Sequence, residues 1–205
     1  MTPEPQHATE RCASSRVRRA LGAVRVRDFA KSWNATAEER TASYPCNCYV
    51  AAPCETFLRA VDVEAPPEVM FRWLCQLKVA PYSYDWIDNR GRRSPRSLTP
   101  GAETLELGQE FLLFWLVEFE PNHHITGVIL PRFERVFGRP AVSYVVEPRG
   151  PERCRLVMRL DVAASSGFGR ARRILLAYGD LIMARKQLLT LKRCAEQTAE
   201  RHASN

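Results

Sequence analysis

The chain has 205 residues and a mass of 23.4 kDa, with 45% apolar and 26% charged residues, which is typical of one globular domain with a tail. Its longest apolar run, Phe111 to Val117, has seven residues, whereas a membrane-spanning helix needs about 20, so a transmembrane protein is excluded. The 30 basic and 23 acidic residues give a net charge of +7, which permits an anionic partner without requiring one.

The positive charge is concentrated at the two ends of the chain. Residues 11–31 carry seven basic residues and one acidic residue, and residues 170–205 carry eight basic and three acidic residues. Such ends can bind nucleic acid or an anionic membrane surface, because each neutralised phosphate releases counterions. They are more typical of a solvated tail and a solvated helix face, so this partner class is an alternative to the main prediction.

The seven cysteines cannot all pair within one chain, and the first thirty residues lack the apolar core of a secretion signal, so we expect reduced thiols in the cytoplasm. Cys46, Cys48 and Cys54 form the one cluster. Structural zinc takes four ligands, and no fourth ligand lies near these cysteines, since His123 and His124 are remote in sequence. We therefore expect no metal site and no cofactor.

Two regions differ in character along the chain. Residues 1–50 are predicted to form a basic N-terminal extension, with one amphipathic helix over Ser15–Lys31 and an irregular connector over Ser32–Pro53. Residues 51–205 carry regular hydrophobic periodicity and are predicted to form the folded domain.

The folded part is expected to begin with a strand and a helix. Residues 55–64 alternate apolar and polar side chains, which is the pattern of a half-buried strand. Pro66 and Pro67 suit the first turn of a helix, whose apolar stripe continues to Lys78, and Pro81 ends it.

Four strands and a long helix are expected after an aromatic segment that contains Tyr82, Tyr84 and Trp86. The gaps between the strands are too short for a crossover helix, so the strands are predicted to be antiparallel. No proline interrupts the final helix, which at 1.5 Å per residue would be roughly 50 Å long. The predicted ranges are Leu105–Phe119, Ile125–Leu130, Ala141–Glu147 and Cys154–Ala163 for the strands and Arg170–His202 for the helix.

From about Trp33 to Ala199 the chain resembles the START-like superfamily, also called SRPBCC or polyketide cyclase/dehydrase and lipid transport. The resemblance is carried by Glu64–Val69, by Trp73–Leu77, by the segment Tyr82–Asn89, and by Met183–Leu189 in the last helix. It implies an α+β helix-grip fold, in which a curved antiparallel sheet wraps around a long C-terminal α-helix. None of these motifs is a catalytic signature.

The resemblance also implies a deep apolar cavity between the sheet and the helix, and the geometry of a bent sheet against a straight helix favours one independently. Side chains that line it would bind the ligand, although aromatic residues and Met at these spacings are often plain core. The candidate ligand-binding residues are Tyr82, Tyr84, Trp86, Phe111, Leu113, Trp115, Tyr144, Met158, Tyr178 and Ile182.

Candidate catalytic groups are few. Glu118, Arg159, Asp161 and the pair His123 and His124 lie on or beside predicted strands. Alternation places Glu118, Arg159 and Asp161 opposite the apolar residues, on an outer face that we expect to be solvated. No nucleophile elbow or phosphate-binding loop is present. We therefore predict a protein that binds or carries a small hydrophobic molecule, such as a lipid, polyketide or isoprenoid-like compound. A polyketide cyclase/aromatase-like enzyme and a protein that docks through its basic termini are the alternatives.

Overall fold

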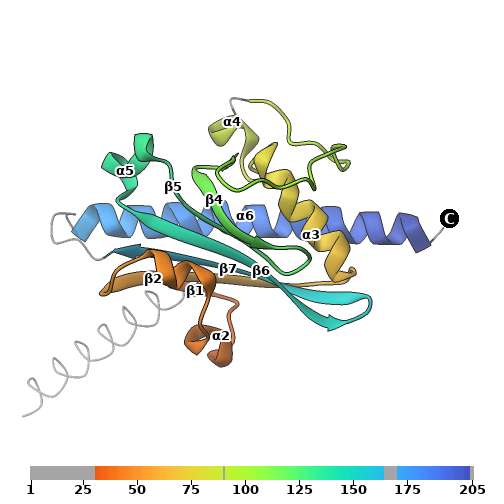
Figure 1. The fold of residues 1–205 in the computed structure, drawn as a ribbon, viewed down its shortest axis with the longest axis horizontal. Coiled ribbons are helices and arrows are strands. Elements are labelled where there is room, and N and C mark those ends of the chain that lie inside the picture. Colours follow the sequence, from red (N-terminus) through yellow and green to blue (C-terminus); the bar gives the residue numbers. More distant parts are fainter. Residues whose placement is uncertain (1–30, 90, 164–169, 204–205) are drawn as a thin grey trace, which may run out of the picture.

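The computed structural model describes residues 31–89, 91–163 and 170–203, with helix residues 87–88 and 170–181 described by their backbone (Figure 1). The predicted helix over Ser15–Lys31 lies outside the described residues except for its last residue. None of the helices in these ranges combines the length and apolar character needed to cross a membrane.

A seven-stranded sheet forms the centre of the molecule, in the order β1-β2-β7-β6-β5-β4-β3. All neighbouring pairs are antiparallel except β1 and β2, which are parallel. The strands are β1 (Ser32–Trp33), β2 (Cys54–Val63), β3 (Glu110–Phe111), β4 (Phe114–Glu120), β5 (His124–Ile129), β6 (Pro140–Gly150) and β7 (Arg153–Ala163).

Two helices cover the inner face of this sheet. The long C-terminal helix α6 (Arg170–Ala203) runs along the sheet, and α3 (Pro67–Cys75) packs against both α6 and β6 (Figure 1). In α6 the buried side chains of Ala184, Leu188, Leu191 and Ala195 recur every three or four residues, so they form one stripe that faces the sheet. The predicted α+β class, an antiparallel sheet with a long C-terminal helix, is confirmed.

On the central strands, every second side chain points to the inner face of the sheet, as predicted. Tyr144 of β6 is paired with Met158 of β7, and both are buried in the main core together with Leu156. The predicted strands after residue 54 match β2, β5, β6 and β7 within a few residues, and the predicted helix up to Lys78 corresponds to α3 followed by the short 3-10 turn η2 (Gln76–Lys78).

The predicted single strand over Leu105–Phe119 is wrong. Leu112, with a φ of 52°, takes the left-handed conformation and turns the chain between β3 and β4, so this segment is a hairpin. As a result Leu116 is buried in the core, whereas Trp115 on the alternate face is partly exposed. A bulge between Leu116 and Glu118 shifts the alternation again further along β4.

A short helix between β5 and β6 was not predicted. Pro131 reads as a turn residue in the sequence, but it stands in the first turn of α5 (Pro131–Phe137), where its missing N–H costs nothing. Gly138, at φ 77°, ends the helix and returns the chain to β6.

Residues 32–33 extend the sheet and residues 37–49 pack on its outer face, so the predicted irregular connector over Ser32–Pro53 is wrong for this part. β1 extends the sheet, and it is followed by α2 (Ala37–Thr41) and the 3-10 turn η1 (Pro45–Tyr49). Thr36 and Glu39 form a capping box at the start of α2, because each side chain accepts a hydrogen bond from the backbone N–H of the other residue. Whether residues 1–50 are a separable extension stays a prediction.

A second, smaller apolar cluster lies between this segment and the sheet. Tyr44 and Cys46 pack there against Leu58, Val145 and Val157, which are the outward-facing residues of the central strands. The central strands are therefore buried on both faces.

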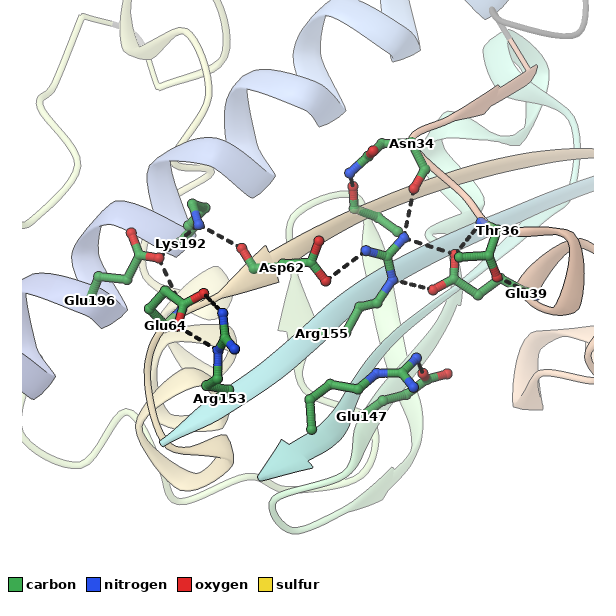
Figure 2. A network of polar contacts seen from close by, with 12 residues as sticks. Asn34, Thr36, Glu39, Asp62, Glu64, Glu147, Arg153, Arg155, Lys192 and Glu196 are labelled. Atoms are coloured by element: carbon green, nitrogen blue, oxygen red, sulfur yellow. Dashed lines mark hydrogen bonds and ion pairs between the residues drawn. The ribbon is translucent and has the colours of Figure 1, made fainter. Parts of the chain in front are cut away.

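One buried arginine holds α2 to the sheet (Figure 2). The Arg155 side chain of β7 is 7% exposed and pairs through Nε and Nη2 with the carboxylate of Glu39, which is 4% exposed. Its Nη1 lies 2.8 Å from Oδ1 of the exposed Asp62, and Nη2 donates to the carbonyl of Asn34 at 2.6 Å. The hydrogen bond to Glu39 is the largest of the causes that raise the pKa of Arg155.

The two carboxylates on Arg155 differ in burial, and we predict different costs of removing them. Glu39→Gln should lower the free energy of unfolding by about 3 kcal/mol, because it leaves a buried guanidinium without its charge partner. Asp62→Asn should cost less than about 1 kcal/mol, since water screens the exposed pair. Urea unfolding of the two variants checks this, and equal costs would mean that α2 does not bury the ion pair.

Gly127 of β5 leaves room for an aromatic ring. A Cβ at this position would lie 2.5 Å from Cε1 of Phe111 and 2.8 Å from Cβ of Phe114. The buried Phe111 ring therefore occupies the space that any other residue at position 127 would fill.

We predict that Gly127→Ala destabilises the fold by about 1–3 kcal/mol, because the added methyl group must displace the Phe111 ring. The cost should shrink in a Phe111→Leu background, which removes the closest contact. Chemical denaturation of the single and double variants gives the coupling energy, and additive costs would contradict this packing.

Candidate functional site

A small hollow lies between α3 and the hairpin strands β3 to β5. Its volume is about 10 Å³, which is room for about one water molecule. Most of its wall is apolar and comes from two stretches of the chain, residues 74–78 and 105–125. The lining residues are Leu74, Cys75 and Lys78 on the helical side, Leu105 and Gln109 before β3, and Phe111, Leu116 and Ile125 on the strands.

The polar group in this wall that lacks a partner is the amide of Gln109. Its Nε2 atom is buried and has no hydrogen-bond partner among the described residues. The backbone of Gln109 is fixed, since its carbonyl accepts a hydrogen bond of 2.8 Å from the N–H of Leu116. A buried amide nitrogen without an acceptor costs about 1–3 kcal/mol, so the hollow favours an occupant that carries a hydrogen-bond acceptor.

The chain between α4 (Asp85–Asp88) and β3 covers one side of the hollow. Its start is anchored by the buried Ser94, which hydrogen-bonds with the carboxylate of Asp85 and the backbone N–H of Tyr82. Lys78 Nζ donates to the carbonyl oxygens of Thr104 at 2.6 Å and Gly101 at 3.2 Å. The backbone N–H of Thr99 donates to Oε1 of the buried Gln76 at 3.2 Å. Because the lysine contacts are exposed to water, they hold the segment only weakly.

Four of the predicted ligand-binding residues come together in the main core: Tyr82, Phe111, Tyr144 and Met158. The hydroxyl of Tyr144 donates to Oε1 of Gln187 at 2.6 Å, and Nε2 of Gln187 donates to the carbonyl of Pro81 at 2.7 Å. These bonds join β6, α6 and the segment before α4 inside the apolar interior.

Tyr82 closes the same interior from the side of α3. Its ring meets Trp73 edge to face with the centroids 5.9 Å apart, and its hydroxyl lies 3.5 Å from Oε1 of Gln76. Burial raises the pKa of Tyr82, so the hydroxyl stays protonated at neutral pH.

The other predicted residues are not brought into this group. Trp86 is 76% exposed, Ile182 53% and Leu113 37%, whereas Tyr84 and Trp115 are partly buried. The side chain of Tyr178 lies outside the described residues.

The position of Ile182 follows from helix geometry. Ile182 is two residues from the buried Ala184, and an α-helix turns by about 100° per residue, so its side chain lies on the opposite side of α6. The apolar pattern that includes Ile182 marks a different stripe from the one that faces the sheet.

Sequence reasoning missed most of the hollow. Leu74 belongs to an apolar helix stripe and Ile125 begins a predicted strand, but neither pattern indicates which core residues border free space. Gln109 follows Gly108, which has a φ of 83° and places the amide just before β3. A polar residue between a turn glycine and an apolar run is a weak signal that could have marked it.

The charged residues of β7 face away from the interior, as alternation predicts, but the outer face there is not solvated. Asp161 is fully buried, and its carboxylate accepts hydrogen bonds of 2.6 Å from both Thr56 and Asn47. Arg159 donates to the same carboxylate at 3.1 Å. The expectation of a solvated face is therefore wrong here, because η1 covers it.

Alternation also places one charged residue on the inner face that was not foreseen. Arg59 of β2 is paired with Met158 and is fully buried. Its Nη1 donates to the carbonyls of Lys31 and Leu58 at 2.8 and 2.9 Å. Arg59 is thus fixed near the N-terminal segment.

The cluster Cys46, Cys48 and Cys54 does not form a group that could hold a metal ion in the part of the chain that is described. Cys46 is buried beside Asp161, Cys48 is exposed and Cys54 is partly buried. Burial raises the pKa of the Cys46 thiol to about 11 and that of Cys75 and Cys154 to about 12.

No family model and no curated protein matches the sequence. Among solved structures, a protein from Thermobifida fusca is 17% identical with a TM-score of 0.47, and the match covers 69% of this chain and 93% of that one. The Zhui aromatase/cyclase from Streptomyces sp. R1128 is 16% identical with a TM-score of 0.41, over 73% and 96% of the two chains. A START superfamily protein from Mycobacterium smegmatis is 14% identical with a TM-score of 0.39, over 71% and 97%.

These structures share an arrangement of elements with this chain. With identities below 25% and TM-scores below 0.5, the likeness concerns the fold and carries no conclusion about activity.

Thiol labelling tests the burial of η1 on the sheet. In a short exposure to N-ethylmaleimide at pH 7.5, the exposed Cys48 should react at least about tenfold faster than the buried Cys46, Cys75 and Cys154. At this pH the three buried thiols stay protonated, because burial raises their pKa values far above 7.5, and the thiolate is the reactive form. Tandem mass spectrometry of the peptides reads out each cysteine, and urea should remove the difference. Equal labelling of Cys46 and Cys48 in the native protein would show that η1 is not packed as described.

Proposed function

We propose that the protein binds a small hydrophobic molecule with a hydrogen-bond acceptor in the interior between α3 and the sheet. The observation that carries this proposal is the hollow itself, where the unpartnered amide of Gln109 lies within a mainly apolar wall. Apolar burial supplies about 25 cal/mol per Å², and one polar contact orients the ligand.

Binding requires the hollow to enlarge. A volume of about 10 Å³ holds no organic ligand, so residues 101–105, which carry the lining residue Leu105, must move outward. The exposed contacts of Lys78 with Gly101 and Thr104 are the ones that break first in this proposal. The strands and α3 stay in place, since their side of the wall belongs to the main core.

The polar content of the interior favours binding over acid–base chemistry. The buried carboxylates Glu39 and Asp161 are on the outer face, and the inner face of β2 carries the buried Arg59 and, at the start of the strand, the partly exposed Glu55. A cyclase-like enzyme needs acid and base groups that converge on its substrate. Lipids, polyketides and isoprenoid-like compounds are the ligand classes to test, with a cytoplasmic site of action supported by the unpaired state of the six cysteines that lie in the described residues.

The test begins with the purified full-length chain. Native mass spectrometry should show a co-purified small molecule that organic extraction releases intact. The emptied protein should then bind N-phenyl-1-naphthylamine, and 2-undecanone, which carries one carbonyl acceptor, should displace it.

Gln109→Leu separates the proposed ligand contact from stability. The variant should unfold at the same or slightly higher urea concentration, because a buried unpaired amide is removed, while the affinity for 2-undecanone falls about tenfold. Gln197→Leu, at an exposed position of α6, is the matched control and should change neither property. No extracted compound together with no binding of the naphthylamine probe would overturn the proposal.

A further inference from the structure

Three metal-ligating side chains meet at the tip of the hairpin formed by β4 and β5, away from the hollow. Glu120 is the last residue of β4, His123 lies in the turn and His124 is the first residue of β5. Asn122, with a φ of 62°, allows the tight turn that brings residues 120 and 123 together. Their donor atoms all lie within 4.8 Å of one another.

The spacing of the donor atoms fits a single ion. Nδ1 of His123 lies 3.1 Å from Oε2 of Glu120 and 3.2 Å from Nδ1 of His124, and the third side of this triangle is 3.8 Å. A circle through three points with these separations has a radius of about 2.0 Å, which is close to the zinc–nitrogen and zinc–oxygen bond lengths of about 2.0–2.2 Å. An ion slightly above the plane of the three atoms would reach all of them.

Hydrogen bonds alone cannot satisfy all the close contacts among these three side chains. A neutral imidazole carries one ring N–H, so Nδ1 of His123 cannot accept from His124 and donate to Glu120 at the same time. A divalent cation accepts a lone pair from each of the three atoms at once.

A second carboxylate lies near the more buried histidine. The His124 side chain is 7% exposed, and its Nε2 lies 3.4 Å from Oε1 of Glu118, within ion-pair distance but without hydrogen-bond geometry. When Nε2 carries the proton and faces this carboxylate, Nδ1 is left with a free lone pair that faces His123 and Glu120. Glu118 is itself held by the hydroxyl of Tyr49 at 3.1 Å, so η1 helps to fix the arrangement.

We propose that Glu120, His123 and His124 form a binding site for a divalent transition-metal ion, with zinc as the probe. Two imidazoles and one carboxylate suit Zn²⁺, Co²⁺ or Ni²⁺, whereas Mg²⁺ and Ca²⁺ take oxygen ligands. His123 and Glu120 are exposed at 49% and 65%, which leaves the fourth coordination position open to water. The sequence prediction of no metal considered the histidines only as partners for the distant cysteines.

Isothermal titration of the full-length chain with ZnSO₄ tests this, using protein without a histidine tag and with a phosphine reductant. One equivalent of zinc should bind. His123→Ala and Glu120→Gln should each weaken the affinity at least about tenfold, in line with loss of one ligand. Both residues are exposed, so their variants should keep the unfolding temperature of the metal-free protein.

Two control variants test whether zinc binds outside the proposed site. His202→Ala removes an exposed histidine of α6 and Cys48→Ser removes an exposed thiol, and neither should alter the zinc affinity. The proposal is overturned if zinc does not bind at millimolar concentration, if both site variants retain full affinity, or if Cys48→Ser abolishes binding.

Discussion

The central strands of the sheet are buried on both faces, and most other features of the molecule follow from this constraint. On β7, Leu156 and Met158 enter the main core, while the residues between and beside them meet a second layer made by α2 and η1. Charged side chains on that second face cannot rely on water. Arg155 is therefore matched by Glu39, and Asp161 by Thr56 and Asn47. A segment that the sequence suggests is a connector is thus a structural layer of the domain.

Much of the architecture could be predicted because it rests on periodicity that one element shows by itself. β2, β6 and β7 alternate, α6 repeats at helical spacing, and short gaps require antiparallel pairing. The errors occur where one residue changes the phase of a pattern. Leu112 reverses the chain inside an apolar run that reads as one strand, and Pro131 begins a helix instead of a turn. The hydropathy of the sequence shows almost no sign of the chain reversal at Leu112 or of the helix that begins at Pro131.

The candidate site could be predicted less well, because it depends on contacts between distant elements. Aromatic residues mark the interior correctly in the case of Tyr82 and Tyr144, yet the same criterion selects Trp86, which is exposed. Free volume next to Gln109 arises from how α3, the preceding segment and β3 to β5 meet, and no local pattern encodes that meeting. The hairpin tip is different, because Glu120, His123 and His124 lie within five consecutive residues around one turn.

The two borders of the sheet consist of strands of two residues each, β1 and β3. Such short borders expose few unsatisfied backbone groups, so they offer little template on which a neighbouring polypeptide could add a strand. β2, which has ten residues, is paired with β1 on that side at Leu58 and Arg59. A protein shortened to begin at residue 51 would lose this pairing, which would leave β2 without a neighbouring strand on that side and favour self-association.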